Sequence, residues 1–237
     1  MKRVKKRTFS GCVCEQVVFS QAENASVCRI KRDRFKDAEQ YAAFKDMIGR
    51  KRFAQLINTN FSPASFKGTL TFDTKNEVHD YDEARAVLRA YVRRIKRKCP
   101  GAKIVVVMGR AVKNAAKIHY HYIMDGVPEE VIRGKWTWGE IVECKHLWEH
   151  VFYNGVDHGR DYTGLANYYW DHWTPEQGGN HYYATRNMDK PETEAPEEIK
   201  REYTEAKPPR APKGYKLVES RKTPFGFLYF KYTKILS

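Results

Sequence analysis

Two histidines stand two residues apart, at His119 and His121, inside the apolar and aromatic segment 118–124. Such a segment predicts a β-strand, in which successive side chains point to opposite faces. His119 and His121 therefore share one face, while Tyr120 and Tyr122 point to the other face and into a core. Neighbouring imidazoles on one face can bind the same metal ion, since imidazole is the commonest side-chain metal ligand. The same spacing also occurs in amphipathic strands that bind no ion, so the spacing alone leaves both interpretations open.

The charge and the aromatic content indicate a polyanionic partner. The 237 residues carry a formal net charge of +14, and 14% of them are aromatic. Aromatic side chains beside basic ones suit stacking against unpaired bases. This combination favours nucleic acid as the partner over a basic surface that serves only solubility.

Several protein classes are disfavoured by what the sequence lacks. The five cysteines are scattered and form no Cys-x-x-Cys pair, which argues against a zinc ribbon and favours reduced thiols. The basic N-terminal segment is not followed by an apolar run, so we expect no signal peptide. No stretch approaches the length of a membrane span, so we expect no membrane partner and a cytoplasmic location.

Hydrophobic periodicity along the chain predicts both helices and strands. Helical spacing of apolar residues predicts helices at 37–57, 81–99, 128–133 and 162–173. Alternating or β-branched segments predict strands at 12–19, 66–72, 104–108, 118–124, 138–147, 215–220 and 227–232. The strand before the histidines should form a hairpin with the histidine strand, and the last two strands should form another. This order predicts an α+β fold, with an antiparallel sheet that carries helices on one face.

We expect one main domain preceded by an arm. Residues 1–36 are predicted to form a basic N-terminal arm with a short strand, and residues 37–237 the domain itself. Within the domain, segment 190–212 is rich in Pro, Glu and Lys, which predicts an exposed low-complexity segment.

Three segments, in this order, resemble the HUH endonuclease superfamily, and in particular the rolling-circle replication initiators of plasmids and phages. A Thr-x-Thr strand comes first, at Thr69-Leu70-Thr71-Phe72, and the His-hydrophobic-His strand follows at 119–121. A tyrosine-bearing helix comes last, at 165–169. The flanking segments 56–61 and 185–191 are also similar to the family, and the resemblance covers about residues 35–232.

The resemblance implies a ferredoxin-like sheet, as in RNA-recognition folds, with the histidine strand at its centre. It implies a divalent cation, Mg2+ or Mn2+, held by His119 and His121. It also implies a tyrosine that attacks a DNA phosphate and leaves a 5′-phosphotyrosine and a free 3′-OH. The chemistry is consistent, because a divalent ion neutralises charge that develops on the phosphate in the transition state.

The resemblance assigns the catalytic role to Tyr168, with Tyr169 as the second choice. Segment 165–168 matches the family's apolar-Ala-Lys-Tyr lead-in, and consecutive helix residues lie about 100° apart, so both tyrosines cannot face the site. The family's lysine three residues after the tyrosine is absent. At that distance Asp171 follows Tyr168, and His172 follows Tyr169.

The third metal ligand also departs from the family. Relatives often carry a glutamate at the end of the strand before the histidines, where this chain has Met108-Gly109-Arg110. Glu143 or Asp125 could substitute for it. Water or the DNA phosphate could also complete the shell, because Mg2+ and Mn2+ prefer oxygen ligands.

Basic clusters supply the candidate DNA contacts, although cations are also common on solvated helix faces and at helix C-termini. The DNA is expected to be single-stranded or locally melted at a replication origin. The chain has no GxxxxGK[ST] pattern, so a host helicase and a host polymerase are implied partners. The candidate DNA-binding residues are Arg29, Lys31, Arg32, Arg93, Arg94, Lys96, Arg97 and Arg186.

The sequence therefore predicts a site-specific single-strand DNA endonuclease and ligase that starts rolling-circle replication. Two alternatives stay open. One is a non-catalytic DNA-binding protein on the same fold, and the other is a related transposase or relaxase that shares the chemistry.

We expect the affinity for single-stranded DNA to fall steeply as salt rises, because the basic clusters at 2–7, 29–36 and 93–98 would neutralise phosphates. Each neutralised phosphate contributes roughly 0.7 to the slope of log affinity against log salt. Fluorescence anisotropy of a labelled oligonucleotide at several salt concentrations measures this slope. A flat salt dependence would contradict binding through the DNA backbone.

Overall fold

The chain divides into two compact units in the computed structural model, which describes residues 2–21, 35–110, 117–173 and 177–236. Unit 1 comprises residues 1–59, 150–162 and 190–237, and unit 2 comprises residues 60–149 and 163–189. Both units are built around antiparallel strands, and the expected α+β class is confirmed.

Unit 2 has the histidine strand at the centre of its sheet. In the described part of the chain the strand order is β6-β3-β5-β4-β9, and β5 is the histidine strand. Along the chain these elements follow one another as β3-α2-β4-β5-α3-β6. Their bounds are β3 Phe66–Thr71, α2 Tyr81–Lys98, β4 Lys103–Arg110, β5 Ile118–Asp125, α3 Glu129–Lys135, β6 Ile141–His146 and β9 Tyr183–Ala184.

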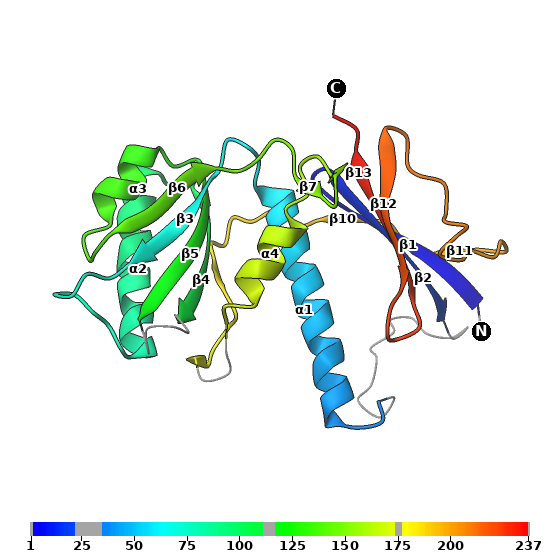
Figure 1. Ribbon diagram of the computed structural model, residues 1–237, viewed down its shortest axis with the longest axis horizontal. Coiled ribbons are helices and arrows are strands. Elements are labelled where there is room, and N and C mark those ends of the chain that lie inside the picture. Colours follow the sequence, from blue (N-terminus) through cyan, green and yellow to red (C-terminus); the bar gives the residue numbers. More distant parts are fainter. Residues whose placement is uncertain (1, 22–34, 111–116, 174–176, 237) are drawn as a thin grey trace. The chain divides into compact units, whose positions relative to one another are not determined.

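The two faces of this sheet have different partners. Leu70, Tyr120 and Tyr122 are fully buried in one core with α2 and α3, which cover the same face in Figure 1. The histidines and the threonines of β3 alternate with these residues and face the other side. The helix α4, Thr163–Trp170, lies on that second side (Figure 1).

The helix α2 shows why this local sequence folds as predicted. Asp80 caps its N-terminus by accepting hydrogen bonds from the backbone of Asp82 and Glu83, at 2.8 and 2.9 Å. Cations occupy its last turn, where the helix dipole favours positive charge. Its buried stripe recurs at helical spacing and consists of Ala84, Leu88, Tyr91, Val92 and Ile95.

Unit 1 contains a second antiparallel sheet and most of the helix α1. In the described residues the strand order is β10-β1-β2-β13-β12, and β11 also pairs with β1. Asp37 caps the N-terminus of α1, because its side chain accepts a hydrogen bond of 2.7 Å from the Gln40 backbone. The bounds are β1 Lys2–Ser10, β2 Val13–Gln21, α1 Ala38–Asn60, β7 Phe152–Tyr153, β8 Val156–Asp157, β10 Glu192–Thr193, β11 Glu197–Glu198, β12 Tyr215–Lys222 and β13 Leu228–Lys234.

The structure differs from the prediction of a basic arm with one short strand. Residues 2–21 form the long hairpin β1–β2, and the short strands β10 and β11 of segment 190–212 pair with β1. The division into 1–36 and 37–237 also differs from the observed units, because β2 pairs with β13 near the end of the chain. The physical reasons are a buried hydrophobic cluster of Cys14, Val18, Phe230 and Tyr232, which joins β2 to β13, and ion pairs that join β1 to segment 190–212. The pairs are Lys2–Glu198, Arg3–Glu202, Lys5–Glu197 and Arg7–Glu194.

Both expected hairpins are confirmed. The strands β4 and β5 are antiparallel neighbours, and β12 and β13 pair across a turn in which the backbone of Thr223 donates to the Phe227 carbonyl at 2.7 Å. The described residues include no helix with both the length and the apolar character needed to cross a membrane.

Replacing Leu70 with alanine should destabilise unit 2, because Leu70 is fully buried in its core. A buried Leu→Ala change costs about 2–5 kcal/mol. All five tryptophans lie in unit 2, so urea unfolding followed by tryptophan fluorescence reports on this unit. The control is Val142→Ala on the neighbouring strand β6, where the side chain is 69% exposed. Equal unfolding midpoints for the two variants would contradict this core.

Candidate metal centre

Three imidazoles converge on the face of the unit 2 sheet that is not covered by α2. His119 and His121 come from β5, and His172 follows the end of α4. In the described part of the chain these three form the group of potential metal ligands, with ligand atoms within 4.8 Å of one another. The Nε2 atoms of His119 and His121 are 3.2 Å apart. Two nitrogen ligands of a tetrahedral ion, each about 2.05 Å from it, are separated by roughly 3.3 Å.

Each of the three imidazole rings has a contact partner at its Nδ1 atom. The Nδ1 atom of His172 donates to the carbonyl oxygen of Tyr168 at 2.7 Å, and Nδ1 of His121 lies 3.1 Å from the hydroxyl of Thr69. The Nδ1 atom of His119 lies 3.5 Å from the Lys117 carbonyl oxygen. Such outer partners orient metal-binding histidines and fix their tautomers. The carbonyl oxygens of Lys117 and Tyr168 can only accept, so the Nδ1 atoms of His119 and His172 carry the proton and their Nε2 atoms keep a lone pair for an ion.

The surroundings favour the neutral form that binds metals. Burial lowers the pKa of His121 to about 3, and the nearby His172, His119 and Lys67 act in the same direction. Burial also lowers the pKa of His119, against the opposing effect of the Lys117 carbonyl. Both imidazoles are therefore uncharged at neutral pH and offer a lone pair. The convergence, the anchored rings and the neutral state together fit a divalent metal ion.

Gly109 explains why the strand before the histidines ends without a side-chain ligand. It pairs with His119 across β4 and β5. A Cβ at this position would lie 2.8 Å from Nε2 of His119 and 3.1 Å from Cδ2 of His172. The space that a glutamate would need is therefore occupied by the imidazoles themselves.

The two carboxylates considered as third ligands have other partners. Glu143 pairs with Lys67 at 3.1 Å, and Asp125 accepts a hydrogen bond of 2.7 Å from Ser65. Neither belongs to the cluster that the described residues form. The third imidazole, His172, takes the place for which the sequence suggested an oxygen ligand.

The two candidate tyrosines have opposite environments. Tyr168 is 53% exposed, and its ring centroid lies 4.5 Å from that of His172 and 5.5 Å from that of His121. Tyr169 is 3% exposed, donates its hydroxyl to the Tyr122 carbonyl at 3.2 Å and stacks on His121. Burial raises the pKa of Tyr169, which disfavours its phenolate. Of the two side chains, Tyr168 is the exposed one, and Tyr169 packs in the core.

The candidate DNA-binding residues on α2 lie on the side of the sheet opposite the histidines. The buried stripe of α2 packs against the sheet face opposite His119 and His121, so the basic end of α2 belongs to the far side of the sheet. Arg94 donates to the Thr137 hydroxyl at 2.9 Å and lies over Trp138, and Lys96 donates to the Ala102 carbonyl at 3.2 Å.

The remaining predicted DNA contacts are exposed or undescribed. Arg93, Arg97 and Arg186 are exposed. Arg29, Lys31 and Arg32 lie outside the residues that the structure describes. A DNA-binding role for these six residues stays a prediction.

Sequence reasoning missed His172 as a potential ligand, although a signal was present. His172 follows Tyr168 by four residues, which places both on one face of a helix. It also missed Lys67, which shares a face with Thr69 and influences the pKa of His121. Lys67 is a buried lysine in the strand β3. It lies near the histidines because β3 pairs with β5, and the sequence alone did not predict this pairing.

Comparison of the chain with protein-family models, with curated proteins and with solved structures finds no match in any of the three. A function for this chain must therefore be argued from the geometry and the chemistry of the site.

Replacing His172 with alanine should weaken metal binding as strongly as replacing His119, because each supplies one of three converging nitrogens. Removing only an outer partner, in Thr69→Val, should cost about 10–100-fold in affinity. Isothermal titration with Mn2+ and Co2+ measures both effects. The control is His79→Ala, an exposed histidine of the same unit. An unchanged affinity in His172→Ala would remove His172 from the metal centre.

Proposed function

We propose that this chain is a metal-dependent, site-specific single-strand DNA nicking and joining enzyme that initiates rolling-circle replication. The observation that carries the proposal is the position of Tyr168. Its exposed ring stands beside three converging, anchored imidazoles, and its centroid lies 4.5 Å from that of His172 and 5.5 Å from that of His121. A nucleophile next to a site for a divalent ion is what cleavage of an unreactive phosphodiester requires.

The proposed reaction is a transesterification. The Tyr168 hydroxyl oxygen forms a bond to phosphorus, the bond from phosphorus to the 3′ oxygen breaks, and the DNA is left as a 5′-phosphotyrosine. The phenol loses its proton to solvent, and the departing 3′ oxygen takes one up, so protons balance. The reverse reaction rejoins the strand. A bound divalent ion would supply positive charge at the scissile phosphate.

The surrounding residues of the chain support this role for Tyr168. Tyr169 is buried and bonded to Tyr122, so it anchors the helix that presents Tyr168. The Tyr168 carbonyl accepts from His172, so the nucleophile and the third imidazole are positioned by the same turn of chain. Three residues after Tyr168 the chain has Asp171, and Lys67 is a cation on the histidine face of β3. With that lysine paired to Glu143, most of the charge that assists a phenolate must come from the ion.

The order of elements in unit 2 also favours the proposal. The succession β3-α2-β4-β5-α3-β6, with β5 between β3 and β4, matches a ferredoxin-like β-α-β-β-α-β arrangement. The proposed family places its metal-binding strand at the centre of such a sheet, and β5 has this position.

The three imidazole nitrogens influence which metal ion would bind. Three imidazole nitrogens are a softer set than Mg2+ prefers, and affinity for nitrogen ligands rises along the first-row transition metals. Of the two expected ions, we propose Mn2+ as the better fit. Cleavage should therefore be faster with Mn2+ than with Mg2+ at equal concentrations.

One observation favours a second candidate function. The position of the family's helper lysine is held by the exposed Asp171. A chain that has lost this lysine could bind DNA without cutting it, on the same fold. The two functions differ in whether a covalent adduct forms.

Replacing Tyr168 with phenylalanine should abolish both the nick and the covalent adduct, because the attacking oxygen is removed while the ring is kept. Tyr169→Phe is the matched control and should keep the adduct, since its hydroxyl is bonded to a carbonyl inside the core. The assay incubates each protein with a library of single-stranded oligonucleotides and Mn2+. Denaturing gels and mass mapping of the DNA-linked peptide identify the residue that is modified.

The outcomes separate the candidate functions. An adduct on Tyr169 or Tyr162 would overturn the assignment of Tyr168. Binding without any adduct on a tyrosine, in the wild-type chain, would favour the non-catalytic DNA-binding protein.

A further inference from the structure

Unit 1 contains a cavity whose lining is cationic and rich in hydrogen-bond donors. It lies between α1 and the strands β1 and β2, and its volume is about 250 Å³. Pockets for drug-sized ligands are larger, roughly 300–1,000 Å³. The cavity therefore suits a small group. The lining residues are Lys6, Thr8, Val17, Ile48, Lys51, Arg52, Gln55 and Thr193.

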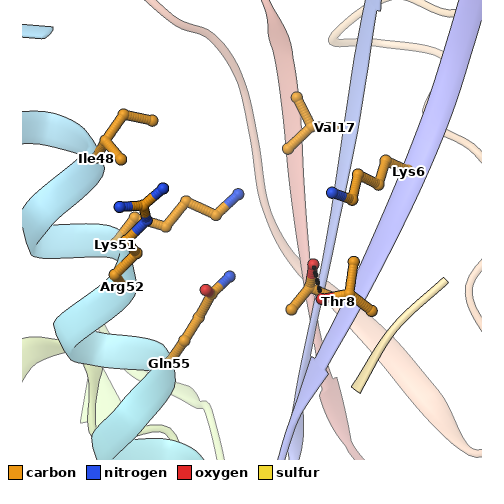
Figure 2. A pocket seen from close by; sticks show the side chains of 8 residues that line it. Lys6, Thr8, Val17, Ile48, Lys51, Arg52 and Gln55 are labelled. Atoms are coloured by element: carbon orange, nitrogen blue, oxygen red, sulfur yellow. Dashed lines mark hydrogen bonds between the residues drawn. The ribbon is translucent and has the colours of Figure 1, made fainter. Parts of the chain in front are cut away.

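Three cations reach this cavity from two sides. Figure 2 shows Lys6 extending from β1 toward Lys51 and Arg52, which extend from α1. None of the eight lining residues is acidic. Lys51 has a distant carboxylate neighbour, Glu15, at 4.0 Å, and that carboxylate already accepts from the Tyr229 hydroxyl at 2.6 Å.

The absence of ion pairs at Lys6 sets it apart from its neighbours on β1. Lys5 and Arg7 point to the opposite face of the strand and pair with Glu197 and Glu194. Among the described residues, Lys6 and Arg52 have no carboxylate within ion-pair distance. The acidic segment 190–212 therefore neutralises several cations of β1, Lys2 among them, but within the described residues it supplies no carboxylate to Lys6 in the cavity.

The polar groups of the lining also favour an anion. The hydroxyl oxygens of Thr8 and Thr193 are 3.3 Å apart, so one donates to the other and one O–H stays available as a donor (Figure 2). A guanidinium and two ammonium groups add donors and no acceptors. An arginine fork matches the oxygens of a phosphate group in particular.

We propose that this cavity binds a phosphate group of the nucleic-acid substrate, as a contact separate from the metal centre. The inference rests on the proposed function for its choice of nucleic acid as the source of the phosphate. Arg52 is exposed and Lys6 is half-buried, so the mouth of the cavity is accessible to a phosphate that remains part of a strand. Such a contact contributes affinity and register without reading the base sequence.

The test compares two double variants with the same loss of charge. Lys6→Gln with Arg52→Gln removes the two cavity cations to which the described residues offer no carboxylate. Lys2→Gln with Arg50→Gln removes one cation from each of the same two elements, where both are ion-paired, with Glu198 and Asp46. All proteins carry Tyr168→Phe and are measured in EDTA, so that neither cleavage nor metal contributes to binding. Circular dichroism checks that each variant is folded.

The cavity variant should bind a single-stranded oligonucleotide about tenfold more weakly, which corresponds to about 1.4 kcal/mol, as expected for lost hydrogen bonds to charged groups. Its slope of log affinity against log salt should fall by roughly 0.7, the contribution of one phosphate. The control variant should bind nearly as well as the parent, because the charges of Lys2 and Arg50 are already balanced by the carboxylates of Glu198 and Asp46. Equal losses in both variants, or no loss in either, would overturn the proposal.

A second arm separates a strand phosphate from a free anion. Inorganic phosphate and pyrophosphate are titrated into the parent and into the cavity variant. Anion binding that depends on Lys6 and Arg52, together with an unchanged DNA affinity, would assign the cavity to a free anion and overturn the proposal. A different result would contradict the proposed function, namely the absence of a covalent DNA adduct when the wild-type chain is incubated with Mn2+. A cavity variant that weakens binding supports this inference whether or not that adduct forms.

Discussion

The burial of two tyrosines on β5 is the constraint on which the candidate metal centre depends. Tyr120 and Tyr122 are fully buried, and their hydroxyls donate to the carbonyl oxygens of Ala84 and Glu143. A slip of one residue would turn both rings to the opposite face and bring His119 and His121 into an apolar core. Burying those polar groups without partners would cost free energy, so the register is strongly specified. The core on one face thereby fixes the imidazoles on the other.

A second layer of packing brings the remaining parts of the site to these imidazoles. Tyr169 stacks on His121 and donates to the Tyr122 carbonyl, which holds α4 against the histidine face of the sheet. Because neighbouring helix residues point in different directions, a buried Tyr169 leaves Tyr168 exposed. The chain then continues for one turn to His172, whose ring is oriented by the Tyr168 carbonyl. One buried tyrosine thus places both its exposed neighbour and the third imidazole.

Electrostatics in unit 1 show that the formal charge of +14 overstates the positive charge available to a partner. Several cations of β1 are paired with glutamates of segment 190–212, as in the pair of Lys5 with Glu197 at 3.0 Å. Within the described residues, Lys6 of β1 and Arg52 of α1 have no such partner in the cavity that they line. The distribution of charge, more than its sum, indicates where an anion would bind.

The sequence by itself determined the local elements and the faces of the strands. Periodicity predicted β3, α2, β5 and α4 to within a few residues, and it put His119 and His121 on one face, because side-chain direction follows from local backbone geometry. Only the tertiary structure decided the third potential ligand. His172 reaches the site through the packing of α4, while Lys67 and Ser65 engage the two carboxylates that the sequence offered. The pairing of β1 with segment 190–212 also joins residues far apart in the chain. Such long-range contacts depend on side-chain packing and on charge pairing between distant segments, and local periodicity carries no information about either.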